Sequence, residues 1–194
     1  WWGAGEAVDG FSGATPLGQI GVAETSTPAF HDIMGNPIGF WDAFIGWIPG
    51  SVGETSTLAI LLGAIVLIVT GVASWKIMLS VFGGGAFMAL VFNLWGPDTA
   101  IAHLPWYEHL VLGGFAFGAV FMATDPVTAA RTETGKWIYG FLIGVMAVII
   151  RVLNPGYPEG MMLAILLMNV FGCLIDWFVV QANIKKRLKR VNSK

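Results

Sequence analysis

The sequence contains little charge and a single cysteine. Only 11% of its 194 residues are Asp, Glu, Lys or Arg, whereas 56% are hydrophobic. This balance lies outside the composition of soluble globular domains and indicates a membrane protein. The lone thiol, Cys173, has no partner for an internal disulfide, and an iron–sulfur cluster needs four thiolates or two thiolates and two histidines. Both kinds of site are therefore excluded, and we expect Cys173 to be a small buried residue.

Other binding patterns are also missing. The three histidines, His31, His103 and His109, have neither the i, i+4 spacing nor the accompanying cysteines of a zinc site. No glycine-rich fingerprint for a dinucleotide is present. We therefore expect no histidine- or cysteine-based metal site, no dinucleotide fold and no nucleic-acid partner.

Five apolar runs are long enough to cross a bilayer, which takes roughly 20 helical residues and at least about 17. They are residues 57–73, 77–95, 107–123, 137–153 and 161–181. The third has a short apolar core that starts close to Glu108 and His109, so we expect it to tilt little or to end early. The sequence therefore predicts an all-α integral membrane protein with five transmembrane helices.

Lysine and arginine are distributed unevenly about these spans. If the five spans alternate, Lys76, Arg131, Lys136 and the basic tail share one side, and only Arg151 lies on the other. Basic loops remain cytoplasmic. The pattern predicts three parts, which are a periplasmic segment 1–55 without lysine or arginine, a five-helix membrane domain 56–184, and a cytoplasmic basic tail 185–194.

The chain starts at Trp1, without an initiator methionine or the pattern of a signal peptide. We interpret it as a piece of a longer subunit. With an odd number of spans and an outer start, the missing part would also cross the membrane an odd number of times. Five further spans would give a paired-repeat architecture.

Aromatic residues recur at helical spacing in the outer segment. Asn36 and Pro37 form a good helix start, and Phe40, Trp41, Phe44 and Trp47 follow before Pro49. Such a segment is typical of a short helix in the membrane interface. A loop packed on the spans by its aromatic side chains is an equally good interpretation.

A run of hydroxyl side chains precedes the first span. Ser51 and Glu54 have the spacing of a capping box at a helix start. Together with Thr55 and Ser56, the same run also offers hydroxyls at a helix N-terminus, where exposed amides favour phosphate or an anionic flavin. Capping and ligand binding are both compatible with this run.

A helix break follows the third span at residues 122–128. Asp125 can cap a new helix there, with Pro126 at its first position. The free amides and hydroxyls of such a break, including that of Thr128, can equally orient a polar ligand. The sequence does not choose between capping and ligand contact.

Asp176 lies inside the last span, four to five residues from its inner end at Gln181. At about 1.5 Å per residue, this places the carboxylate some 7 Å below the polar edge. An acid at this depth is costly unless it is paired, hydrated or functional, so ion handling is one hypothesis. Contact with headgroups or with Lys185 and Lys186 is the other.

The segment at residues 9–17 reads Asp-Gly-Phe-Ser-Gly-Ala-Thr-Pro-Leu. By composition it is a turn in which Gly13 permits unusual dihedral angles and Pro16 fixes the chain. It also resembles the flavinylation motif of respiratory membrane flavoproteins, in which a transferase attaches FMN to the threonine oxygen as a phosphodiester. The resemblance makes Thr15 the acceptor, with Ser12, Gly13 and Ala14 shaping the motif.

The resemblance covers essentially the whole chain. The segments at residues 50–59 and 122–128 and the five spans resemble a family with two branches, the B subunits of the sodium-translocating NADH:quinone oxidoreductase and the D subunits of the Rnf ferredoxin:NAD oxidoreductase. The long outer loop and its tryptophans favour the quinone reductase. The family implies a ten-helix repeat fold that resembles urea transporters, of which this chain would supply helices six to ten, in the bacterial inner membrane.

The resemblance also implies cofactors and partners. The protein would carry covalent FMN at Thr15 and noncovalent riboflavin, and it would relay electrons toward ubiquinone coupled to Na+ extrusion. An FAD- and iron–sulfur-containing NADH-oxidising subunit and a second FMN-bearing subunit would be its partners. Glu54, Thr55 and Ser56 would surround the FMN, Asp125 and Thr128 would contact the riboflavin, and Asp176 would bind Na+. No residue needs to act as an acid–base or nucleophilic catalyst.

Two other classes of function are compatible with the same spans. A passive channel or solute transporter would use the helical fold and leave Thr15 in an ordinary turn, because a fold alone does not define a function. A purely structural membrane anchor for a redox complex is the other. Both predict a chain without covalent flavin.

Overall fold

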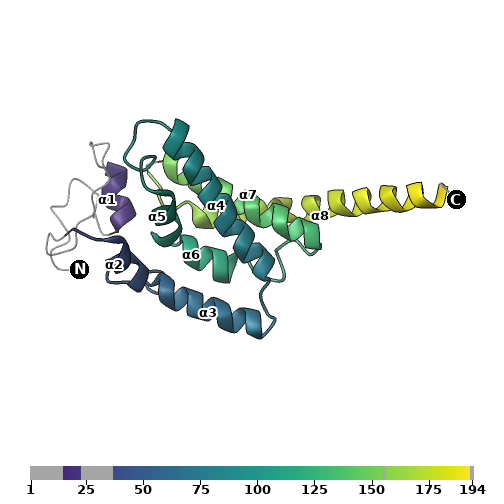
Figure 1. The fold of residues 1–194 in the computed structure, drawn as a ribbon, viewed down its shortest axis with the longest axis horizontal. Helices are drawn as coiled ribbons and strands as arrows, with labels where there is room; N and C mark the ends of the chain where they lie inside the picture. Colours follow the sequence, from purple (N-terminus) through teal and green to yellow (C-terminus); the bar gives the residue numbers. More distant parts are fainter. Residues whose placement is uncertain (1–14, 23–36, 155, 193–194) are drawn as a thin grey trace.

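The structure is a computed structural model that describes residues 15–22, 37–154 and 156–192 (Figure 1). Every regular element of this part of the chain is helical. The elements are α1 (Pro16–Val22), α2 (Phe40–Ile45), α3 (Thr57–Val69), α4 (Trp75–Trp95), α5 (Trp106–Val111), α6 (Phe115–Phe117), the single π-helical turn η1 (Gly118–Met122), α7 (Glu133–Leu153) and α8 (Met161–Asn192).

Three helices in the described ranges are long and apolar enough to cross a membrane, namely α4, α7 and residues Met161–Val191 of α8. These candidate spans agree with the predicted ones at residues 77–95, 137–153 and 161–181. The helix α3 is apolar but has 13 residues, fewer than the roughly 20 that a bilayer core requires.

The predicted span at residues 107–123 is not one continuous helix. It is divided into α5, α6 and η1, with an interruption around Gly113. Gly113 has a φ of +66°, a left-handed conformation that glycine adopts at little cost and that ends α5. The average hydropathy of a span does not reveal such a break.

The centre of the bundle is formed by α4 packed along α7, with α8 against the other side of α7 (Figure 1). The helices α4 and α7 approach closely at glycines. A Cβ added at Gly84 would overlap the carbonyl oxygen of Phe141, and one added at Gly144 would overlap that of Val81. Small residues therefore set the distance between these helices.

The last helix extends well beyond the rest of the bundle (Figure 1). It has 32 residues, so at 1.5 Å per residue it is about 48 Å long, against roughly 30 Å for a bilayer core. Its projecting end carries the basic tail and stays helical to Asn192. The interpretation of Cys173 as a buried residue is wrong, since it lies exposed on this helix.

The short aromatic helix predicted between Asn36 and Pro49 is α2. It begins at Phe40 after the N-cap Gly39, and not at Pro37 as the sequence suggested. Asp42 provides the cap, since its Oδ2 accepts from the Gly39 amide at 3.0 Å. The ring of Phe40 packs edge-on against Tyr107 with 5.2 Å between the ring centroids, so α2 is tied to α5 by aromatic contact.

Candidate functional site

Thr15 is the residue immediately before α1. Its half-buried side chain accepts a hydrogen bond from the Gly18 amide at 3.1 Å, and its carbonyl accepts from Gln19 at 3.0 Å. These are the bonds of an N-cap threonine, and Pro16 suits the first helical position. The hydroxyl oxygen is thus held in a fixed place at the start of α1.

The Thr15 side chain lines a small crevice that also contains Glu54, Thr55 and Glu159. The four residues come from three separate parts of the chain. The fold therefore brings Thr15 together with Glu54 and Thr55, two of the three residues predicted to surround the FMN. The crevice holds about 10 Å³, roughly the room of one water molecule. A flavin ring carried by Thr15 must therefore lie outside it.

Both carboxylates of the crevice approach the backbone between α5 and α6. The Gly114 amide donates to Oε2 of Glu159 at 2.9 Å. A Cβ added at Gly114 would lie 2.9 Å from Oε2 of Glu54, and one added at Gly113 would overlap Oε2 of Glu159. The break in the predicted third span is therefore the feature that admits two acidic side chains.

Arg151 is fully buried and does not itself line the crevice. Its guanidinium donates to the carbonyl oxygens of His109 at 2.7 Å, Pro158 at 3.1 Å and Leu112 at 3.2 Å. Its charge also interacts with the carboxylates of Glu159 and Glu54. One buried cation thus fastens the end of α7 to α5, within electrostatic reach of both carboxylates of the crevice.

Sequence reasoning missed Arg151 and Glu159 as part of this site. The signal for Arg151 was present, since it is a basic residue inside an apolar span and such residues require partners. Its partners are backbone carbonyls in α5 and in the turn before α8, which no local pattern reveals.

The remaining residues predicted for the FMN site lie outside the described part of the chain or away from the crevice. Ser12, Gly13 and Ala14 lie outside the described residues. The capping box of Ser51 and Glu54 does not start a helix, because α3 begins at Thr57 and its cap is Ser56, which accepts from Ala59 at 3.3 Å. Ser56 does not line the Thr15 crevice.

Asp125 and Thr128 lie at the opposite end of the bundle and contact each other. Oδ2 of Asp125 accepts from the Thr128 hydroxyl at 2.8 Å and from its amide at 3.1 Å. The Thr128 hydroxyl, followed by the backbone amides, lowers the pKa of this carboxyl below its usual value of 3.8. Asp125 caps a turn here and not the helix that the sequence suggested, since α7 begins only at Glu133.

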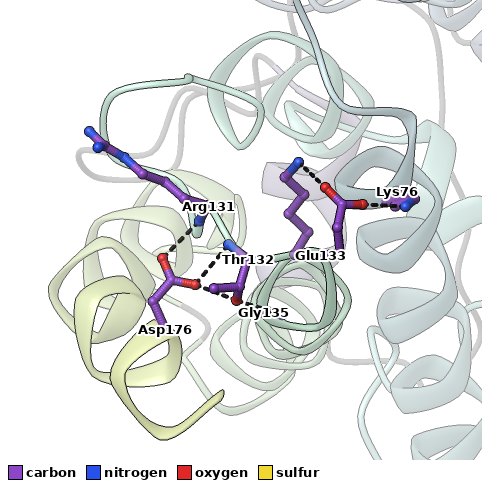
Figure 2. Close-up of polar contacts among 7 residues, drawn as sticks. Lys76, Arg131, Thr132, Glu133, Gly135 and Asp176 are labelled. Atoms are coloured by element: carbon purple, nitrogen blue, oxygen red, sulfur yellow. Dashed lines mark hydrogen bonds and ion pairs between the residues drawn. The ribbon is translucent and has the colours of Figure 1, made fainter. Parts of the chain in front are cut away.

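Asp176 fastens α8 to the start of α7 (Figure 2). Its Oδ1 accepts from the Thr132 hydroxyl at 2.6 Å and from the Thr132 amide at 3.0 Å, and its Oδ2 accepts from the Arg131 amide at 2.8 Å. A Cβ added at Gly135 would lie 2.6 Å from Oδ1 of Asp176, so glycine is needed for this approach. The carboxylate is paired with backbone and hydroxyl donors, and not with Lys185 or Lys186.

No group of three or more His, Cys, Asp and Glu side chains gathers as a metal site within the described residues. Na+ is a hard cation that takes oxygen ligands, and carbonyl and hydroxyl oxygens would have to join Asp176. The assignment of Na+ to Asp176 stays a prediction.

Comparison with known proteins places the chain in a family. The sequence model of the NQR2, RnfD, RnfE family matches residues 1–185. The chain is similar to proteins named as the B subunit of Na(+)-translocating NADH-quinone reductase from Chromohalobacter salexigens and Ectopseudomonas mendocina, at 57% identity, and from Yersinia pestis, at 56%. Each similarity covers 95% of this chain and 44–45% of the relative, so the chain spans less than half of their length. The chain belongs to the NQR2, RnfD, RnfE family.

Proposed function

We propose that the chain is part of the membrane-embedded B subunit of a sodium-translocating NADH:quinone oxidoreductase. Its similarity to proteins of that name over 95% of its length supports this, as do the three membrane-spanning helices. In this role it relays electrons toward ubiquinone within an assembly in the bacterial inner membrane. NADH oxidation belongs to an FAD- and iron–sulfur-containing partner, and a second FMN-bearing subunit lies beside it.

The observation that carries the proposal is the position of the Thr15 hydroxyl. The side chain is half-buried, its oxygen is fixed by the Gly18 amide, and the residue lines a crevice too small to enclose a flavin. These properties fit covalent attachment of FMN through its phosphate, with the ring on the outer surface. When bound, the flavin would accept electrons and pass them on.

The charged residues in and near the Thr15 crevice would set the electrostatic surroundings of such a flavin. Glu54 and Glu159 place negative charge at the crevice, and buried Arg151 partly balances it. Carboxylates disfavour an anionic reduced ring and a nearby guanidinium favours it, so the balance among the three would tune the reduction potential. Thr55 completes the crevice wall.

We further propose that the chain crosses the membrane five times and forms half of a ten-helix repeat that resembles urea transporters. The helix α3 and the broken segment from α5 to η1 pack against each other and would make two of the crossings. Lys76, Arg131 and Lys136 then lie on the cytoplasmic side with the tail, and Thr15 lies on the periplasmic side.

The cytoplasmic end is the proposed location of the other two ligands. Asp125 and Thr128 contact riboflavin there, and Asp176 contributes a carboxylate oxygen to Na+ within the membrane. Each of these residues already holds a turn or a helix start, so ligand binding would be added to a structural role.

Fluorescence of the denatured full-length protein tests the proposal. Made together with its flavin transferase, the wild-type polypeptide should fluoresce in a denaturing gel, and Thr15→Ala should be dark. A passive channel or a structural anchor predicts a dark wild-type band. That result would remove the redox role of this chain.

A further inference from the structure

A cavity of about 440 Å³ lies at the end of the bundle away from Thr15. It falls within the size range of small-molecule sites, roughly 300–1,000 Å³. Its walls are the turn at residues 71–74, the first turn of α4, the segment between η1 and α7, and the first turn of α7. No residue assigned above to FMN lines it.

The cavity carries an excess of positive charge. Lys76 and Lys136 both contact Glu133, with 2.8 Å between Nζ of Lys136 and the carboxylate, so two ammonium groups share one carboxylate (Figure 2). Arg131 also lines the cavity, although Figure 2 shows its side chain directed away from Glu133. Ser74, the N-cap of α4, lines the cavity and makes no side-chain cap bond, so the first amides of α4 lack that acceptor.

An apolar groove lies farther along the same two helices. It holds about 650 Å³ and is lined by Leu79, Ser80, Phe82, Gly83, Trp137, Ile138, Phe141 and Leu142. On α4, Leu79, Ser80 and Gly83 follow Lys76 at spacings of three, four and seven residues, which places them on the face of Lys76. A Cβ at Gly83 would meet no atom within 4 Å, so the groove is open there.

Two tryptophans connect the cavity and the groove. Trp75 lines the cavity and Trp137 lines the groove, and their rings meet edge to face with 6.0 Å between centroids. Tryptophan is enriched at the level of the lipid headgroups. The surface thus matches a phospholipid in order. The polar cavity corresponds to the headgroup, the tryptophan pair to the headgroup boundary, and the apolar groove to an acyl chain.

We propose that this surface binds an anionic phospholipid, with its phosphate at Lys76 and Lys136 and an acyl chain along the groove past Gly83. Basic pockets between membrane helices on the cytoplasmic side are recognised sites for acidic headgroups. The two lysines that share Glu133 provide the surplus charge that distinguishes an anionic from a zwitterionic lipid. The site is independent of the flavin at Thr15.

The first test compares lipids and lysine variants in the full-length complex. Delipidated complex in detergent is titrated with phosphatidylglycerol or phosphatidylcholine, and bound lipid is counted by native mass spectrometry. Each lysine removed should weaken phosphatidylglycerol binding about fivefold, so Lys76→Gln with Lys136→Gln weakens it about twenty-five-fold. The matched control, Lys185→Gln with Lys186→Gln, removes the same charge from α8 and leaves the affinity unchanged.

The second test separates a lipid from a free anion. Gly83→Leu fills the groove without touching the lysines, and leucine is a better helix former than glycine, so the fold is preserved. It should weaken phosphatidylglycerol binding at least tenfold, while inorganic phosphate should not displace the lipid. Wild-type affinity in the double lysine variant, equal affinity for phosphatidylcholine, or displacement by phosphate with no effect of Gly83→Leu would each overturn the proposal.

Discussion

The carboxylate of Asp176, in the middle of α8, accepts hydrogen bonds from both the hydroxyl and the amide of Thr132, the N-cap residue of α7. The Thr132 hydroxyl in turn accepts from the Gly135 amide at 3.1 Å. One acidic side chain therefore fixes the start of one membrane helix against another. These bonds account for an aspartate in an apolar span without any ion, so a role in Na+ binding needs evidence of its own.

Asp176→Asn and Thr132→Val separate the two roles of this pair. Both should lower the free energy of unfolding by about 1–3 kcal/mol, because each leaves donors or acceptors without partners. Only Asp176→Asn should also raise the KM for Na+ of the assembled complex, because it alone removes the ligand charge. Unchanged sodium-dependent turnover in Asp176→Asn would exclude this residue as a Na+ ligand.

Adjacent glycines on α4 give a matched pair of packing variants. Gly84→Ala should destabilise the protein by about 1–3 kcal/mol, because the new methyl group overlaps the backbone of α7 at Phe141. Gly83→Ala meets no atom and should leave the stability unchanged or raise it. Thermal unfolding in detergent measures both, and equal midpoints for the two variants would contradict this account of the α4–α7 contact.

Arg151→Lys tests the contact by which Arg151 joins α7 to α5. The guanidinium of Arg151 donates to three carbonyl oxygens at once. A lysine has a single ammonium group that cannot reproduce this fork, so buried carbonyl oxygens would lose their hydrogen-bond donor. If the ammonium group keeps one of the three acceptors, two stay unsatisfied, and at about 1–3 kcal/mol for each we expect a loss of at least about 2 kcal/mol. Thermal unfolding midpoints of the full-length protein measure it. A midpoint equal to that of the wild type would show that the three bonds do not hold α5 and α7 together.

The pair of Asp125 and Thr128 predicts a pH effect. Because folding lowers the pKa of Asp125, the ionised carboxylate stabilises the folded turn at pH values above 3.8. This stabilisation disappears as the pH falls through the lowered folded-state pKa. Thr128→Val removes the donating hydroxyl and should raise the pKa toward 3.8.

Carbon-13 NMR of labelled aspartate carboxyls measures that titration. Asp125→Asn identifies the signal, because only the resonance of residue 125 disappears in that variant. An identical titration in wild type and Thr128→Val would contradict the assigned cause of the shift.

The spans that sequence analysis placed well are those whose apolar character is continuous. The predicted start of the last span at Met161 agrees with α8, and the end at Leu153 agrees with α7. The last helix continues past Gln181 because lysine, arginine and leucine are good helix formers, so leaving the apolar region does not end the helix.

The break between α5 and α6 was beyond sequence analysis. Gly113 and Gly114 sit in an apolar run and read as ordinary small residues of a span. Their conformation is explained by Glu159 and Glu54, which approach from distant parts of the chain. The same long-range contacts build the crevice at Thr15. Sequence analysis named Glu54 and Thr55 as neighbours of Thr15, whereas Glu159 was found only in the structure.

We propose that Thr15 carries FMN, and intact-mass spectrometry of the full-length protein can detect the attached group. Cleavage after glutamate should release residues 7–24, which include Thr15 and no lysine or arginine. We expect this peptide to carry one FMN group in wild type. Thr15→Asn is the control, because asparagine also caps a helix well but has no hydroxyl to accept the phosphate.

Loss of the added mass in Thr15→Asn, with an unchanged unfolding midpoint, is the predicted result. An unmodified residue 15 in wild-type protein made together with an active flavin transferase would contradict the account.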